Sequence, residues 1–319
     1  MRPDQPLVSV VIPCFNAERW IGAAIESVRA QTWPSVELVI VNDGSTDNSL
    51  DEIHRVKTAR TIVVDQRNRG QTAALNAGLS RCSGRFIQYM DADDALAPAK
   101  IERQMNRLRE AGQAVATARW EVLPTAATVP AGDPPACDAA TDAAAPQDWL
   151  VDNWRDGGGM MFPAMWLAPR SVVDRAGPWS EDLTLGNDTE YFTRLVLAAD
   201  AIIQCPDAVC YYRKGHTSMS GLKTDAAWRS AFRSIERSTG RLLQVENSDR
   251  TRRATSFVWQ RFANACYPYA RTLGIEAERR AKDLHGDRLR LSGGAAYNFV
   301  TAVFGWKAAR ALQVMLGRH

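Results

Sequence analysis

The amino-acid sequence predicts an α/β fold with a mostly parallel sheet, and two observations support this prediction. Short apolar runs rich in β-branched residues alternate with segments of helical period through the first third of the chain. Polar clusters directly follow three of these runs. The loop after the first run contains no Gly-x-Gly-x-x-Gly sequence, which argues against a Rossmann dehydrogenase.

Four apolar runs are expected to form strands, namely Leu7–Ile12, Glu37–Val41, Thr61–Val64 and Phe86–Met90. Helices are expected where apolar residues recur at helical spacing, as they do at Ile21, Ala24, Ile25 and Val28 and again at Ile101, Met105 and Leu108. Another helix is predicted over Asp188–Ala199, and the chain beyond Thr224 is expected to be almost entirely helical. These patterns predict an α/β domain over residues 1–220, with a flexible insertion at 124–146, and a helical region over 221–319.

Composition excludes several classes of protein. The 319 residues are 45% hydrophobic and 24% charged, which is typical of a soluble globular protein. The formal charge is only +3, so no nucleic-acid partner is expected. The six cysteines include no Cys-x-x-Cys pair and are interpreted as reduced, mostly buried thiols. With neither a signal-peptide pattern nor a run of about 20 apolar residues, the sequence predicts a cytoplasmic protein whose membrane contact, if any, is peripheral.

An acidic turn, containing Asp91, Asp93 and Asp94, directly follows the fourth predicted strand. Carboxylates this close together repel one another unless a cation is present. Mg²⁺ or Mn²⁺ held by one or two carboxylates completes its coordination with water and substrate phosphates, so the turn indicates a diphosphate ligand. A capping role, in which Asp93 or Asp94 begins the helix that contains Ile101, explains the same residues equally well.

A second acidic turn, Asp43 to Asp47, follows the second strand, and an aromatic residue, Phe15, follows the first. Taken alone, Asp43 to Asp47 is better explained as a turn that caps the next helix. However, parallel strands bring their carboxyl ends to one crevice, where ligands bind. A nucleotide base needs an aromatic face and an acceptor for its ring N–H, and Phe15 and Asp43 would supply both.

Five segments are similar to motifs of the family 2 glycosyltransferases: Val8–Asn16, Val41–Asp47, Gln66–Gly70, Ala74–Gly78 and Met90–Asp94. Leu75 stands where many members have arginine. The resemblance covers roughly the first two thirds of the chain. It implies a GT-A-type, Rossmann-like mixed sheet flanked by helices, with a nucleotide-binding half over residues 1–95 and an acceptor half over 96–220.

The resemblance implies a role for each matched donor-side residue. Asp43 is expected to hydrogen-bond the base, Pro13 and Phe15 to border it, and Arg67 to lie near the nucleotide.

The resemblance also implies a metal site for Mn²⁺ or Mg²⁺. Asp91 is expected to approach the ribose or the metal, and Asp93 to ligate the metal. His216 lies in a segment, Tyr211–Ser220, that resembles a family segment near the diphosphate. A metal or phosphate ligand and an exposed loop histidine explain His216 equally well.

Asp188 is the predicted general base. The segment Ala176–Trp179 resembles one that precedes an acceptor-side Glu-Asp pair in the family, and here that pair reads Asn187-Asp188. Inverting transfer needs one carboxylate that takes the acceptor hydroxyl's proton. An ordinary capping aspartate is the structural alternative, and Glu190 is the second candidate base.

The last helical stretch carries apolar residues at helical spacing, at Tyr297, Val300, Phe304, Ala308, Ala311 and Met315, beside the cations Lys307, Arg310 and Arg318. Such a helix can dock on an anionic membrane surface. Packing on the domain or on a second copy of the chain in a homo-oligomer is the favoured alternative.

The sequence therefore predicts a metal-dependent inverting glycosyltransferase that uses a nucleotide sugar, with a UDP-sugar favoured. Its acceptor is expected to be a saccharide or a lipid-linked intermediate in polysaccharide or glycoconjugate synthesis. A catalytically silent nucleotide-sugar-binding or scaffold protein of the same fold is the main alternative. Nucleotidyl transfer is less favoured, because no glycine-rich basic phosphate loop is found near the N-terminus.

Overall fold

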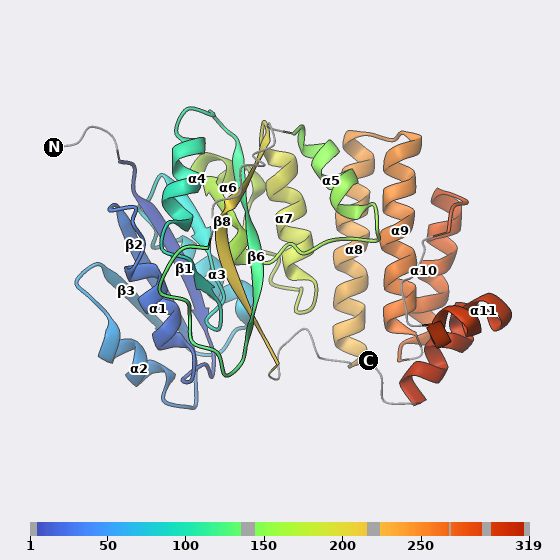
Figure 1. The fold of residues 1–319 in the computed structure, drawn as a ribbon, viewed down its shortest axis with the longest axis horizontal. Coiled ribbons are helices and arrows are strands. Elements are labelled where there is room, and N and C mark those ends of the chain that lie inside the picture. Colours follow the sequence, from blue (N-terminus) through green and yellow to red (C-terminus); the bar gives the residue numbers. More distant parts are fainter. Residues whose placement is uncertain (1–4, 135–143, 216–223, 268, 289–294, 316–319) are drawn as a thin grey trace. The chain divides into compact units, whose positions relative to one another are not determined.

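The computed structural model describes residues 5–134, 144–215, 224–267, 269–288 and 295–315 (Figure 1). The chain forms two compact units. The first comprises Met1–Pro146 and Met161–Thr217, and the second comprises Gln147–Met160 and Ser218–His319.

The first unit contains a mixed, eight-stranded sheet with the order β3-β2-β1-β4-β7-β6-β8-β5. Its strands are β1 (Val8–Cys14), β2 (Val36–Asp43), β3 (Thr61–Gln66), β4 (Phe86–Tyr89), β5 (Ala95–Leu96), β6 (Val115–Pro124), β7 (Trp166–Pro169) and β8 (Ile202–Lys214). Strands β1 to β4 pair in parallel, whereas β7 pairs antiparallel with both β4 and β6. The predicted class, a mostly parallel mixed sheet flanked by helices, is confirmed.

Helices flank this sheet and also build the second unit (Figure 1). The first unit has α1 (Ile21–Arg29), α2 (Ser49–Val56), α3 (Gln71–Leu79), α4 (Lys100–Leu108), a 3₁₀ turn (Pro163–Met165), α6 (Arg170–Ala176) and α7 (Asn187–Ala198). The second has α5 (Pro146–Trp154), which begins at its boundary, α8 (Asp225–Val245), α9 (Asp249–Cys266), α10 (Arg271–Leu284) and α11 (Ala295–Met315). The helical C-terminal region is thus confirmed.

The four predicted N-terminal strands are confirmed with small shifts at their ends. Strand β1 lies between β2 and β4, and all seven of its residues are buried. A strand covered on both faces needs a continuous apolar run rather than alternation, which is why such runs were recognisable in the sequence. The backbone ladder continues beyond the apolar residues to the polar ends of β2 and β3, Asp43 and Gln66.

Helix α5 falls on the other side of the unit boundary from the sequence-based interpretation, which placed residues 147–160 in the first domain. The side chains of Trp149, Leu150 and Trp154 are buried, and Asp148 forms an ion pair with Arg250 of α9 at 2.6 Å. These contacts group α5 with the helical unit, although it precedes strand β7 in the chain.

The second unit has an aromatic core of its own. The rings of Phe232 and Trp259 lie 4.9 Å apart, and Phe262 packs edge-on against both. The guanidinium of Arg280 lies over the Phe232 and Trp259 rings at 4.8 and 5.1 Å and forms an ion pair with Glu236. Among the described residues, no helix is both long and apolar enough to cross a membrane.

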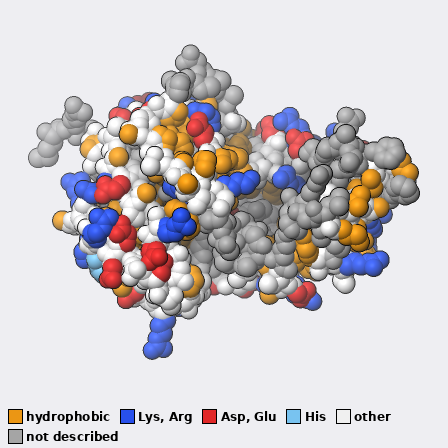
Figure 2. Space-filling view, turned by 60° about the horizontal axis from the view of Figure 1, so that its bottom comes forward, with side chains coloured by type: hydrophobic (Ala, Val, Ile, Leu, Met, Phe, Trp, Pro, Cys, Tyr) orange, Lys and Arg blue, Asp and Glu red, His pale blue; other side chains and the backbone are white. Residues whose placement is uncertain are grey.

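Five of the six cysteines lie in described segments, and all five are free thiols, as expected. On the face shown in Figure 2, acidic and basic side chains are interspersed, with no large patch of one sign among the coloured residues. This surface agrees with the near-neutral composition.

A carboxylate at the amino ends of the central strands ties three segments together. Glu37 on β2 accepts hydrogen bonds from the Ser9 hydroxyl at 2.5 Å, from the Ser83 amide and hydroxyl at 2.6 and 2.7 Å, and from the Gly84 amide at 3.2 Å. Partial burial raises the pKa of Glu37, but these hydrogen bonds outweigh it and hold that pKa below its ordinary value of 4.5.

Replacing Glu37 with leucine is expected to lower the free energy of unfolding by about 1–3 kcal/mol, because buried donors lose their acceptor. Since the folded pKa is depressed, the ionised carboxylate stabilises the fold above the unfolded pKa, and this contribution disappears as pH falls through the folded value. Urea unfolding at neutral and acidic pH measures both effects. Glu37→Gln, which keeps one acceptor oxygen, is the matched control. Equal stability of wild type and Glu37→Leu at neutral pH would contradict the role.

Candidate active site

The loops after β1 and β2 lie beside each other at the carboxyl edge of the sheet. The Asn16 side-chain oxygen accepts from the Thr46 amide at 2.8 Å, and the Asn16 amide donates to the Ser45 hydroxyl at 3.1 Å. Asn16 has a positive φ of 50°, a conformation that asparagine tolerates better than most residues. The two polar clusters therefore share one rim, as parallel pairing of β1 and β2 requires.

Asp43 holds the loop that follows β3. One carboxylate oxygen accepts from the Gln66 amide group at 2.7 Å and the Arg69 backbone N–H at 2.9 Å, and the other accepts from the Gly70 N–H at 2.8 Å. Each carboxylate oxygen can accept about two hydrogen bonds, so Asp43, which is 3% exposed, has capacity for one more. Gly44, with φ 71°, allows the close approach, since a Cβ there would lie 2.6 Å from the Asn68 nitrogen.

Asp47, rather than Asp43, bonds to the start of α2, although the N-cap residue of this helix is Asn48. Asp47 accepts from the Ser49 amide and hydroxyl at 3.0 and 2.5 Å at the start of α2, and from the Glu18 amide at 3.1 Å. The two ends of the second acidic turn therefore have different structural roles.

The other residues predicted to lie at the nucleotide differ in exposure. Half of the Phe15 side chain is exposed at the rim, and Arg67 is also exposed, whereas Pro13 is buried within β1. Phe15 and Arg67 are thus available to a ligand, and Pro13 shapes the strand end beneath them. His216 lies outside the described residues.

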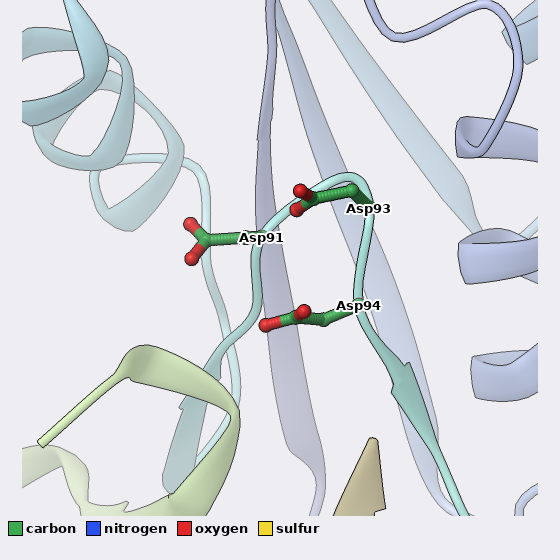
Figure 3. Close-up of side chains that lie close together, drawn as sticks. All are labelled: Asp91, Asp93 and Asp94. Atoms are coloured by element: carbon green, nitrogen blue, oxygen red, sulfur yellow. The ribbon is translucent and has the colours of Figure 1, made fainter. Parts of the chain in front are cut away.

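The acidic turn after β4 brings three carboxylates together. Asp91, Asp93 and Asp94 each offer an oxygen within 4.8 Å of the others, and Figure 3 shows all three side chains pointing to the same side of the turn. Helix α4 begins only at Lys100, after the short strand β5, so neither Asp93 nor Asp94 caps it. The capping alternative for this turn is therefore wrong.

Charge accumulates at this turn. The pKa of Asp91 is raised well above its ordinary value by burial and then by the charges of Asp188 and Asp93. Burial, Asp91 and Asp93 likewise raise the pKa of Asp94, whose Oδ2 is buried and has no hydrogen-bond partner among the described residues.

A divalent cation fits this donor set. Octahedral Mg²⁺ binds oxygen at about 2.1 Å, which places opposite ligands about 4.2 Å apart. The three carboxylates offer oxygens within 4.8 Å of one another, slightly beyond that span, so a single ion would draw them closer together. Their mutual repulsion favours a bound cation.

Arg213 on β8 holds the acidic turn in place through a set of hydrogen bonds, called here the Arg213 clamp. Its backbone N–H donates to Asp94 Oδ1 at 3.0 Å, and its guanidinium donates to the Asp93 carbonyl at 2.9 Å and to three carbonyls between residues 124 and 127. Composition and spacing did not suggest this role, because the segments joined are far apart in the sequence.

Asp188 lies in the first turn of α7 and faces the acidic turn. Its charge contributes to the raised pKa of Asp91, and burial raises the pKa of Asp188 itself to about 7. Its Oδ1 is buried and accepts no hydrogen bond from any described residue, and Gly186 occupies the N-cap position. An ordinary capping aspartate would bond to backbone N–H groups, so this arrangement does not support the capping alternative.

Glu190, the second candidate base, has a different environment. It is 1% exposed and forms two hydrogen bonds with Arg194 at 2.8 Å, while Ser180 donates to it at 3.1 Å. Arg194 also donates to the Ala176 carbonyl. A carboxylate engaged in this way holds the structure together, which leaves Asp188 as the favoured base.

Gln71, which the sequence did not mark as a site residue, lies between Asp91 and the start of α7, where Asp188 lies. Its amide nitrogen donates to Asp91 at 2.8 Å, and its oxygen accepts from Asn187 at 3.0 Å. The one available signal was its position, directly after Gly70 in the loop that follows a parallel strand.

Residues 9–128, which include both acidic turns and the β3–α3 loop, match the family described as Glycosyl transferase family 2. This segment is a family 2 glycosyltransferase domain. Among curated relatives, an uncharacterized glycosyltransferase of Haemophilus influenzae is 36% identical over 106 residues, which cover 32% of this chain and 42% of that protein. An uncharacterized glycosyltransferase of Nostoc is 41% identical over 99 residues, or 30% of this chain and 31% of that one. The match thus spans less than half of each relative.

Solved structures extend the likeness beyond the family 2 domain. TarS residues 1–349 of S. aureus, in complex with UDP-GlcNAc, aligns with a TM-score of 0.71 at 16% identity and covers 98% of this chain and 93% of that one. The mannosyltransferase PcManGT of Pyrobaculum calidifontis, in complex with GDP-Man and Mn²⁺, aligns with a TM-score of 0.60 at 15% identity and covers 99% and 89%. At such identities these likenesses show the fold alone.

Proposed function

We propose that this chain is an inverting, metal-dependent glycosyltransferase that transfers a sugar from a nucleotide-sugar donor to a saccharide or lipid-linked acceptor. The observation that carries the proposal is that the carboxylate-rich turn of the family 2 domain faces the carboxylate of Asp188, which lies outside that domain on α7. The ligands of two proteins of the same fold, UDP-GlcNAc in one and GDP-Man with Mn²⁺ in the other, support a nucleotide-sugar donor.

The donor's nucleotide would lie over the loops after β1 to β3. Phe15 offers an exposed aromatic face to the base, Pro13 shapes the strand end beneath, and Asp43 keeps one acceptor position open. Arg67 is exposed at the same rim and would meet the phosphates or ribose. We favour a UDP-sugar.

Asp91 and Asp93 would hold Mn²⁺ or Mg²⁺, with His216 as a further candidate ligand. When bound, such an ion neutralises charge on the departing diphosphate. The neighbouring Asp94 is bonded to the Arg213 backbone, so one of its oxygens is already occupied.

Asp188 would take the proton from the acceptor hydroxyl. The acceptor oxygen forms a bond to the anomeric carbon on the face opposite the nucleotide, the bond from that carbon to the diphosphate oxygen breaks, and the diphosphate leaves with the electron pair. The configuration at the anomeric carbon is therefore inverted. The raised pKa of Asp188, about 7, suits a general base near neutral pH.

The test is nucleoside diphosphate release from a panel of UDP-, dTDP- and GDP-sugars with Mn²⁺ or Mg²⁺, with and without saccharide and lipid-linked acceptors. Metal-dependent release with at least one donor, fastest with a UDP-sugar, is the expected result, and NMR of the product should show inverted configuration. Donor binding without release under any condition would favour the catalytically silent alternative. A product with retained configuration would overturn the single-displacement mechanism.

A further inference from the structure

Gln71 is the first residue of α3, and its amide lies between the carboxylates assigned to opposite sides of the proposed reaction. Its Nε2 donates to Asp91 Oδ1 at 2.8 Å, and its Oε1 accepts from Asn187 Nδ2 at 3.0 Å. Asn187 is 6% exposed and immediately precedes Asp188. Two hydrogen bonds thus join the acidic turn after β4 to the start of α7.

These hydrogen bonds have a fixed direction. The NH₂ of Gln71 faces the Asp91 carboxylate, so its oxygen faces a donor on the other side. The NH₂ of Asn187 is that donor, which turns the Asn187 oxygen toward the backbone N–H of Asp188, where it accepts at 2.9 Å. Each amide group has only one orientation that satisfies both of its partners.

These two hydrogen bonds matter because few other contacts orient the Asp188 carboxylate. Its Oδ1 is buried and accepts no hydrogen bond from any described residue, and the N-cap of α7 is Gly186, which has no side chain. The direction of the Asp188 carboxylate therefore depends on the backbone at the start of α7. Asn187 holds that backbone, and Gln71 holds Asn187.

We propose that Gln71 is a positioning residue that sets the Asp188 carboxylate relative to Asp91 through Asn187. Asp91 stands on the donor side and Asp188 on the acceptor side, so the link fixes the separation over which the acceptor oxygen must meet the anomeric carbon. This inference rests on the proposed function. Gln71 acts through its hydrogen bonds to Asp91 and Asn187.

The central test compares Gln71→Met, which keeps the side-chain length but removes both hydrogen bonds, with Asn187→Ser. Serine is too short to reach Gln71, yet it offers an oxygen suited to the first turn of a helix. Both variants are expected to lower kcat by about 10- to 100-fold, since small misplacements of reacting groups have effects of that size. Their acceptor KM should change by less than about threefold. Only Gln71→Met should also weaken Mn²⁺ binding, measured by calorimetry with UDP present.

The double variant tests whether Gln71 acts through Asn187. If it does, the two effects on kcat are non-additive, and the double variant falls no further than about threefold below Gln71→Met alone. Gln104→Met provides the control, because Gln104 is a buried glutamine that bonds carbonyls in the core. It should lower the unfolding midpoint while leaving kcat per folded molecule unchanged.

The inference is overturned if Gln71→Met keeps both kcat and Mn²⁺ affinity within threefold of wild type. It is also overturned if the two single effects multiply in the double variant, or if activity is lost only in proportion to unfolded protein. Failure of the proposed function would look different, because wild type itself would release no diphosphate with any donor. The Mn²⁺ titrations would then still report whether Gln71 orients Asp91.

Discussion

Asp188→Asn is expected to lower kcat for sugar transfer by about 10²- to 10⁴-fold, the usual contribution of a positioned general base. Asparagine has nearly the same shape but cannot take up the acceptor's proton. Affinity for the donor should stay within a few-fold of wild type, because the proposed role of Asp188 is to act on the acceptor. Steady-state diphosphate release with acceptor gives kcat, and calorimetry with the intact nucleotide sugar gives the donor affinity.

The pH dependence of activity is a second test of Asp188 as the general base. Burial raises the pKa of Asp188 to about 7 in the free protein, and a base acts only when unprotonated. The kcat/KM for the acceptor should therefore rise with pH through about 7 in wild type. The residual activity of Asp188→Asn should not show this rise.

Glu190→Gln is the matched control for this prediction, since it changes an acid in the same helical turn. It disturbs the ion pair with Arg194 and should lower stability, yet kcat per folded molecule should match wild type. Loss of activity in Glu190→Gln but not in Asp188→Asn would reverse the assignment of the base.

Asp93→Ala is expected to reduce kcat/KM by about 10³-fold or more and to weaken Mn²⁺ binding by at least about tenfold. A bound cation contributes several kcal/mol to the stabilisation of a leaving diphosphate, and each 1.36 kcal/mol corresponds to a factor of ten in rate. Initial rates over a Mn²⁺ series, with UDP-dependent Mn²⁺ binding by calorimetry, measure both changes.

The stability of Asp93→Ala distinguishes a lost metal site from a damaged fold. Burial raises the pKa values of Asp91 and Asp94 and the charge of Asp93 adds to the effect, so removing Asp93 relieves part of the repulsion in the metal-free protein. The metal-free variant should therefore unfold at no lower urea concentration than wild type. Asp51→Ala, which changes an exposed acid on α2, should leave rates and Mn²⁺ affinity unaltered. Undiminished metal-dependent turnover in Asp93→Ala would remove Asp93 from the metal site.

The parts of the site carried by consecutive residues were predictable. Buried parallel strands require continuous apolar runs, and the loops that follow them share one edge, so the positions of Asp43 and Asp91 followed from local pattern. The sequence alone left a capping role for Asp93 or Asp94 equally open, because the two-residue strand β5 that separates them from α4 is too short to leave a pattern.

Contacts between residues far apart in the chain were not predictable from one sequence. Gln71 and Asn187 are 116 positions apart, and nothing in either neighbourhood marks them as partners. The antiparallel pairing of β7 with β4 and β6 likewise depends on tertiary contacts rather than on hydrophobic period. Assignment of α5 to the helical unit has the same origin, since a buried tryptophan does not reveal which core surrounds it.

The Arg213 clamp has a consequence for how the acidic turn responds to a ligand. A guanidinium stays charged across the physiological range, so its hydrogen bonds to the Asp93 carbonyl and to carbonyls between residues 124 and 127 persist whatever the protonation of the nearby carboxylates. Uptake of a cation would then change the charge of the turn without reshaping its backbone. In such a preorganised turn, little of the free energy of binding would be consumed in ordering it.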